Sequence, residues 1–234
     1  MNPRTVEALN HINQRFYDQE SAERFHATRE TPWPGFQRVV DELPAGGLRV
    51  LDVGCGNGRL LRFLERARLS SYTGVDQSQA LLRHARRVDA AGLHVRFEHY
   101  NLLEDALPRG EFELVALFGV MHHVPGEAQR RALLQQAATR LARGGVLAVT
   151  FWRFAELSRF DGHRRDWGEA GLDPSEREPG DHLLTFQGRG LRYCHHCDAA
   201  EQERLCDGLG LQGLARFRAD GRSDDLNDYV LLRR

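Results

Sequence analysis

Short apolar runs alternate with stretches of helical periodicity through the middle of the chain. The apolar runs predict strands over residues 48–53, 72–75, 94–99, 112–118 and 146–152. Between them apolar residues recur at helical spacing, as at Leu81, Ala85 and Val88. The longest predicted helix runs from about residue 127 to 141, where a glycine pair at 144–145 gives a C-cap signal. This alternation predicts a parallel, doubly wound α/β sheet.

Both ends of the chain carry weaker patterns. The N-terminal segment predicts a helix that continues to Tyr17, then a fixed extended corner where two prolines flank Trp33, then a short helix over residues 35–43. Residues 153–192 show no clean periodicity, and an excursion of this size in a compact domain is usually functional or mobile. Beyond it we predict a helix over about 199–209 and strands near 214–218 and 229–232.

The turn after the first strand contains the residues that most strongly suggest a ligand site. It reads Asp52-Val-Gly54-Cys-Gly56-Asn-Gly58, and a helical pattern that extends to about Arg68 follows at once. Glycines let a ligand approach the main chain, and the helix N-terminus offers free N–H groups. A dinucleotide fingerprint would need its third glycine one residue later, and the Asp52 carboxylate would repel a pyrophosphate. The turn instead suits a ligand that carries an ammonium group and a ribose.

This D-x-G-x-G-x-G turn resembles the first motif of class I S-adenosylmethionine (AdoMet) methyltransferases; the alternative is a tight strand–helix turn without a ligand. Ligands of open α/β sheets bind beyond the carboxyl ends of the strands. Asp76 ends the second strand, where a carboxylate takes ribose hydroxyls or caps the next helix. We expect Asn101 to accept a hydrogen bond from the adenine amino group and Leu102 to lie along the adenine ring. Phe118 or Val120 either covers the other side of the ring or belongs to the hydrophobic core. The predicted cofactor residues are Asp52, Gly54, Cys55, Gly56, Gly58, Asp76, Gln77, Asn101, Leu102 and Phe118.

Two histidine-containing segments have competing interpretations. His122 and His123 follow the fourth strand, where the methyl donor should point, so they face a substrate or belong to a polar loop. The run Cys194-His195-His196-Cys197 looks like a zinc knuckle, but one C-x-x-C pair supplies two ligands where a structural site needs four. We therefore predict no metal.

Composition narrows the choice of function. The chain has 234 residues, 41% hydrophobic and 28% charged, which fits one large α/β domain. All 32 basic residues are arginine, which excludes a Schiff-base or Walker lysine. A net charge of −1 gives no global basic footprint for nucleic acid. Four cysteines are too few for a disulfide framework, and no leader or membrane span is evident, so we expect a cytoplasmic protein without membrane contact.

Three separated patches resemble one subfamily, the tRNA wobble-uridine (carboxymethyluridine) carboxyl methyltransferases. The first comprises Tyr17-Asp18, Phe25 and Thr28-Arg29-x-x-Pro-Trp-Pro34. The second is the cofactor core from Asp52 to His123, and the third is Leu191-Arg-Tyr-Cys-His195, with Asn227 before the last strand. Departures from the family pattern are Cys194 in place of an aromatic residue, Asp228-Tyr229 in place of a tryptophan-containing pair, and Asn101 in place of an acid.

The resemblance implies a Rossmann-like fold with a seven-stranded sheet, mostly parallel with an antiparallel last strand. It implies one methyltransferase domain, made of an N-terminal helical cap (1–46), a cofactor core (48–152), a substrate-side insertion (153–192) and the C-terminal part of the sheet (193–234). The implied reaction is methylation of a tRNA carboxylate, with S-adenosylhomocysteine as product. Eukaryotic members of the family also work with a small zinc-bearing activator subunit.

A carboxylate acceptor needs no general base, because it is already ionised at pH 7. It needs a cationic, bidentate anchor, for which arginine is suited. We therefore predict Arg29, His122 and His123 as catalytic residues, and as substrate residues Tyr17, Trp33, Trp152, Arg192, Tyr193 and His195. The alternatives are a small-molecule O-methyltransferase of the same class, a non-catalytic AdoMet-binding partner subunit and a dinucleotide oxidoreductase.

Overall fold

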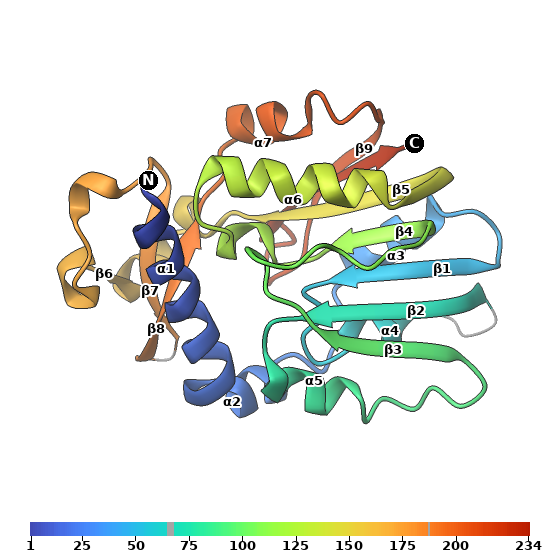
Figure 1. Cartoon of the computed structure of the whole chain (residues 1–234), viewed down its shortest axis with the longest axis horizontal. Coiled ribbons are helices and arrows are strands. Elements are labelled where there is room, and N and C mark those ends of the chain that lie inside the picture. Colours follow the sequence, from blue (N-terminus) through green and yellow to red (C-terminus); the bar gives the residue numbers. More distant parts are fainter. Residues whose placement is uncertain (65–67, 187) are drawn as a thin grey trace.

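The computed structural model describes residues 1–64, 68–186 and 188–234. Within these residues the main sheet has seven strands in the order β3-β2-β1-β4-β5-β10-β9 (Figure 1). Its strands are β1 (Leu48–Val53), β2 (Leu69–Asp76), β3 (His94–His99), β4 (Phe112–Leu117), β5 (Leu141–Trp152), β9 (Gln212–Ala219) and β10 (Asn227–Arg233). The last strand, β10, runs antiparallel to both of its neighbours, and the other pairings from β3 to β5 are parallel. The predicted fold class is confirmed.

Helices cover both faces of this sheet. One apolar cluster packs α6 (Glu127–Thr139) and α7 (Ala199–Cys206) against residues such as Leu51 and Val53. The other packs α3 (Gly35–Asp41) and α4 (Arg59–Phe63) against Leu48 and Val50. Alternate residues of β1 therefore enter opposite cores, which is why this strand reads as a continuous apolar run in the sequence.

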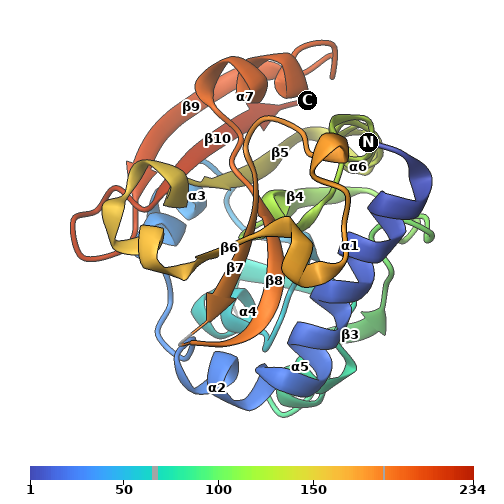
Figure 2. The same ribbon diagram turned by 90° about the vertical axis from the view of Figure 1, so that its left-hand side faces the viewer.

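A second, smaller sheet forms from the segment without periodicity. It has the order β6-β7-β8, with strands β6 (Arg164–Arg165), β7 (Asp181–Phe186) and β8 (Arg189–His195), all antiparallel. Short 3₁₀ helices precede β7 at Phe154–Glu156, Ser158–His163, Trp167–Ala170 and Pro174–Glu176. Figure 2 shows this sheet beside α1 (Pro3–Arg15), in front of the strand ends of the main sheet. Leu9 and Ile12 of α1 pack there against Tyr193.

The N-terminal segment follows its predicted course except for one short helix, which the sequence did not predict. Asn2 caps α1 by accepting from the Thr5 N–H, and the helix continues into a π-helical turn at Phe16–Glu20. A short helix α2 (Ala22–Ala27) precedes the corner around Trp33. This whole segment thus runs along the carboxyl ends of the parallel strands (Figure 1), where a ligand of such a sheet binds.

Several predicted boundaries shift. The helix before β5 ends at Thr139, and β5 begins at Leu141, with Gly144 at φ +76° inside the strand instead of capping a helix. Strand β2 starts three residues earlier than predicted, and α4 ends at Phe63. The predicted continuation of α4 to about Arg68 falls partly on residues 65–67, which lie outside the described residues. Between β2 and β3 the helix α5 spans Gln79–Ala85. No helix of the described residues is long and apolar enough to span a bilayer.

Candidate active site

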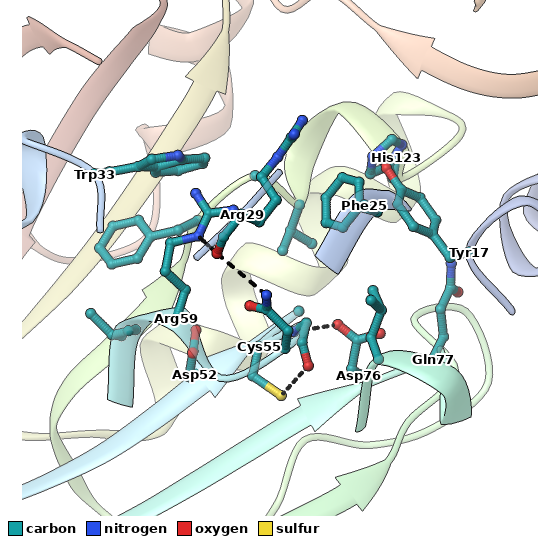
Figure 3. Close-up of a pocket in the computed structure, with 18 of the residues that line it drawn as sticks. Tyr17, Phe25, Arg29, Trp33, Asp52, Cys55, Arg59, Asp76, Gln77 and His123 are labelled. Atoms are coloured by element: carbon teal, nitrogen blue, oxygen red, sulfur yellow. Dashed lines mark hydrogen bonds between the residues drawn. The ribbon is translucent and has the colours of Figure 1, made fainter. Parts of the chain in front are cut away.

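A cavity lies between the strand ends and the N-terminal segment (Figure 3). Its lining comes from three regions: the glycine turn with the ends of β1, β2 and β4, the segment from Tyr17 to Phe36, and the 3₁₀ turn Met121–His123. Of the predicted site residues it includes Tyr17, Arg29, Trp33, Asp52, Gly54, Cys55, Gly56, Asp76, Gln77, Leu102, Phe118 and His123.

The structure requires glycine at the positions of the turn for different reasons. Gly54 has φ +74°, and a Cβ on it would lie 2.2 Å from Cγ2 of Val120. Gly56 has φ +54° and no atom within 4 Å of the corresponding position, so it leaves open space above the backbone. Gly58 instead precedes α4, packs against Ala85 and does not line the cavity. Open space for a ligand beside the main chain is therefore provided at Gly56, whereas Gly54 is required by the close packing of Val120.

Two buried carboxylates bound the floor of the cavity. Asp52 accepts a hydrogen bond from the Tyr72 hydroxyl, and burial raises the pKa of its carboxyl to about 7. Asp76 accepts from the Gly56 N–H and the Ser78 N–H, both at 2.8 Å, and burial raises its pKa to about 6. Ser78, and not Asp76, caps α5 through its own hydroxyl. Asp76 thus ties the glycine turn to the end of β2 while facing the cavity.

The residues predicted to bind the adenine ring are only partly placed as expected. Gln77, Leu102 and Phe118 line the cavity, and Oε1 of Gln77 is buried without a hydrogen-bond partner in the described structure. Asn101 does not line it: its Oδ1 accepts from Asn10 Nδ2 at 3.0 Å and from a backbone N–H. The side chain that would accept from an adenine amino group is therefore turned towards α1, and Gln77 carries the unpaired acceptor.

Residues 25–33 form the roof of the cavity, which we call the lid. The backbone carbonyl of Arg29 accepts from Asn57 Nδ2 at 3.3 Å and from Arg59 Nε at 3.0 Å (Figure 3). Asn57 Nδ2 also lies 3.0 Å from Nδ1 of His26. The guanidinium of Arg59 lies 5.1 Å from the Trp33 ring. Asn57 and Arg59 belong to the glycine turn and α4, so two residues beside the cofactor floor hold the lid.

Tyr17 and His123 form a defined hydrogen-bonded pair. His123 Nδ1 lies 3.0 Å from the carbonyl oxygen of Tyr193, which can only accept, so this nitrogen carries the proton. His123 Nε2 therefore accepts from the Tyr17 hydroxyl at 2.7 Å. Burial and the nearby Arg192 lower the pKa of His123 to about 3, so the ring is neutral. Asn13 supports the pair by donating to the His123 carbonyl oxygen and accepting from the Tyr193 N–H.

Two arginines approach this pair without an acidic partner. Arg192 is 6% exposed, donates to the Tyr17 hydroxyl oxygen at 3.4 Å, and has an Nε atom with no hydrogen-bond partner in the described structure. The rings of Phe16, Trp152 and Phe186 surround its guanidinium at 5.0–5.6 Å. Arg29 lies over Phe25 at 4.4 Å. Among the described residues no carboxylate pairs with either guanidinium, so positive charge is concentrated beside the cavity.

The remaining predicted residues lie behind this surface. His122 does not line the cavity; its ring lies 5.0 Å from Trp152, and its Nδ1 is buried without a described partner. Tyr193 and His195 belong to a buried ionic network, in which the Tyr193 hydroxyl donates to Asp181 and His195 bridges Asp181 at 2.7 Å and Glu201 at 2.8 Å. They anchor β8 and do not reach the cavity.

This ionic network also contains the residues whose spacing suggested a zinc knuckle. His195, Cys197 and Glu201 place one potential ligand atom each within 4.8 Å of one another, and Glu178 and Asp181 do so with His195. His195 already bonds to Asp181 and Glu201, and the buried Arg130 donates to Glu178 and Glu201. Its carboxylate partners raise the pKa of His195 to about 11, against the effect of burial. The protonated ring therefore donates to one carboxylate from each of its two nitrogens, a structural role that requires no metal ion.

Similarity to known proteins decides the family. A family model described as a methyltransferase domain matches residues 50–145. A methyltransferase-family protein of Encephalitozoon cuniculi is 34% identical over 202 residues, covering 86% of this chain and 87% of that protein. The chain is an AdoMet-dependent methyltransferase. This confirms the predicted enzyme class and cofactor, and the unpaired Gln77 oxygen and the Asp52 carboxylate fit the polar groups of AdoMet.

Other relatives of this methyltransferase act on different acceptors. The tRNA (carboxymethyluridine(34)-5-O)-methyltransferase of Schizosaccharomyces pombe is 27% identical, covering 69% of the chain and 66% of the yeast protein. The 27-O-demethylrifamycin SV methyltransferase of Amycolatopsis mediterranei is also 27% identical, covering 94% of the chain and 88% of that protein. The solved magnesium protoporphyrin IX methyltransferase of Synechocystis with bound AdoMet shares the fold, with a TM-score of 0.64, 16% identity and coverage of 100% and 98%.

Asn57, Arg59 and Phe25 are among the cavity residues to which the sequence-based prediction gave no role. Asn57 and Arg59 stand inside the glycine turn and directly after it, but their attachment to the lid depends on the path of a segment about thirty residues away. Phe25 was part of a motif, yet its place under Arg29 follows from the turn between α2 and the corner. The motif could have identified Arg59 as a cation beside the cofactor, since it follows Gly58 directly.

Proposed function

We propose that this methyltransferase transfers a methyl group to a carboxylate oxygen, and that the acceptor is the carboxymethyl group of the wobble uridine of tRNA. The observation that carries the proposal is the pair of arginines for which no acidic partner is found among the described residues: Arg29, which lines the cavity, and Arg192, which donates to the cavity residue Tyr17. Desolvated charge of this kind is costly unless an anion is bound. An acceptor carboxylate would supply that anion.

The residues beside the cavity suit a nucleophile that is already ionised. AdoMet supplies an electrophilic methyl group whose leaving group is a neutral thioether. A carboxylate oxygen forms the new C–O bond as the S–C bond breaks, so a methyl ester and S-adenosylhomocysteine result and no proton is released. The neutral His123 has a pKa of about 3, which makes it a weak base. Its role is to accept from Tyr17 and fix the hydroxyl beside Arg192.

The lid would contribute orientation and exclusion of water. Trp33 and Phe25 are aromatic side chains of the lid that line the cavity, and either offers a stacking face for a nucleobase. The Schizosaccharomyces pombe relative supports a wobble uridine as the acceptor. The small-molecule alternative is supported by the net charge of −1 and by the Amycolatopsis mediterranei relative.

Arg29→Ala tests the anchor. We expect methylation of a carboxymethyluridine-containing anticodon stem–loop to be lost while AdoMet binding, measured by calorimetry, is retained. Arg24→Ala, which removes an exposed arginine of α2, is the matched control and should keep full activity. Unchanged turnover in the Arg29 variant would reject the anchor assignment.

The identity of the acceptor needs a separate experiment. Mass spectrometry of tRNA from a deletion strain should show loss of the wobble-uridine methyl ester. An unchanged methyl ester level would remove the tRNA proposal and leave a small acidic molecule as the acceptor, to be sought with a panel of carboxylic acids.

A further inference from the structure

A third arginine, Arg59, lines the cavity close to the backbone of Arg29. It is the first residue of α4, directly after Gly58. Its Nε donates to the Arg29 carbonyl, and the plane of its guanidinium group lies near Trp33, as Figure 3 shows. Among the described residues no carboxylate forms an ion pair with it. Arg59 is therefore a partly buried cation that is held in place but not neutralised.

Nearby acids do not supply the missing charge. Asp220 attracts Arg59 at a distance, but its oxygens accept from the Gly35 N–H, Asn227 Nδ2 and the Tyr229 hydroxyl. Burial, together with the neighbouring cations Arg29 and Arg62, lowers the pKa of Arg59 to about 9. An anion in the cavity beside Arg59 would stabilise its charged form and raise the pKa of its guanidinium again.

We propose that Arg59 binds the α-carboxylate of AdoMet, while Asp52 receives its α-ammonium group. The side chains of Arg59 and Asp52 rise next to each other from the two ends of the glycine turn (Figure 3), and Arg59 acts on the Asp52 carboxyl as a neighbouring positive charge. The amino-acid end of AdoMet carries both charges, so it matches this pair. Arg29 is the weaker candidate, because its guanidinium lies over Phe25 and Phe186, on the side of Arg192.

This assignment separates the arginine that binds the cofactor from the two that are proposed to bind the acceptor. Arg59 takes the carboxylate of the cofactor, and Arg29 and Arg192 stay available for an acceptor. The inference rests on the AdoMet site alone and does not depend on the proposed tRNA acceptor.

Calorimetry with two ligands tests the assignment. S-adenosylhomocysteine contains the amino-acid end, and methylthioadenosine lacks it. For Arg59→Gln we expect S-adenosylhomocysteine to bind about tenfold to a hundredfold more weakly, the usual worth of a charge-assisted hydrogen bond. Methylthioadenosine should bind within about twofold of its wild-type affinity. For Arg59→Lys, which keeps the charge but not the bidentate geometry, the affinity for S-adenosylhomocysteine should lie between those of the wild type and Arg59→Gln.

The control is Arg38→Gln on α3, an arginine that lies 3.7 Å from the Phe217 ring and does not line the cavity. It should leave both affinities unchanged. An equal loss for both ligands in the Arg59 variant would overturn the proposal, because it would mean that Arg59 acts by holding the lid. No loss for either ligand would also overturn it, because the carboxylate would then be bound elsewhere.

Discussion

Asp52 should make cofactor binding depend on pH near neutrality. Its carboxyl is 2% exposed, and burial raises its pKa to about 7, although the Tyr72 hydrogen bond acts in the opposite direction. Only the ionised carboxylate attracts the ammonium group of the cofactor. Because the pKa of Asp52 is raised in the free protein, lowering the pH below 7 protonates it and weakens binding; raising the pH restores the charge.

The size of the effect follows from the fraction of ionised Asp52. With a pKa of about 7, the apparent Kd scales with one plus the ratio of protonated to ionised carboxyl. This factor is about 11 at pH 6 and about 1.3 at pH 7.5, so the Kd should rise roughly eightfold over that interval. The window ends at pH 7.5 because an α-amino group itself begins to lose its proton near pH 8.

Calorimetric titration with S-adenosylhomocysteine from pH 5.5 to 7.5 measures this dependence. The Asp52→Asn variant should bind S-adenosylhomocysteine more weakly than wild type at pH 7.5, and its Kd should not change with pH above pH 6. At lower pH its affinity should still decline, because Asp76, whose pKa is raised to about 6, becomes protonated. Methylthioadenosine, which has no ammonium group, should bind wild type with little change above pH 6. A Kd for S-adenosylhomocysteine that stays constant between pH 6 and 7.5 would refute the role of Asp52.

Two further predictions concern stability. Gly54→Ala should lower the Tm more than Gly56→Ala, because both incur about 1–2 kcal/mol of left-handed backbone strain but only the first drives a methyl group into Val120; equal Tm values would contradict this reading. His195 has a folded-state pKa raised to about 11, so its contribution to stability is complete below about pH 6.5 and declines as the pH rises. Denaturant titration should show a fall of up to about 1.4 kcal/mol per pH unit between pH 7 and 9, and His195→Asn should remove this slope.

The cofactor half of the site could be predicted because its signals are local. β1, the glycine turn and Asp76 belong to one strand–helix–strand unit, in which turn chemistry and strand ends fix the geometry. The central position of β1, between β2 and β4, agrees with its continuous apolar sequence, which is typical of a strand that is buried on both faces of the sheet. The exception is Asn101, because the side chain that occupies its oxygen, Asn10, comes from a helix ninety-one residues away.

The acceptor half could be predicted only as a set of residue types. Tyr17, His123 and Arg192 come from three distant segments, and their hydrogen bonds depend on where β8 packs against α1. The small sheet itself was missed, because β6 has two residues and β7 and β8 lie in a stretch rich in charge and glycine. Alternation along β8 explains the position of Tyr193: the side chain of Arg192 points towards Tyr17, so the next side chain points the opposite way and joins the buried ionic network.

The lid connects the two halves of the site through one carbonyl group. Asn57 and Arg59 stand beside the cofactor, and both donate to the Arg29 carbonyl oxygen, whereas the Arg29 guanidinium faces the acceptor side. A cofactor carboxylate bound by the terminal nitrogens of Arg59 would leave its Nε free to keep holding the lid. The cofactor would then also relieve the repulsion between Arg59 and Arg29 that the free protein carries. Both effects would hold Arg29 in the position that the structure shows, so we expect a bound cofactor to stabilise the geometry that receives the acceptor.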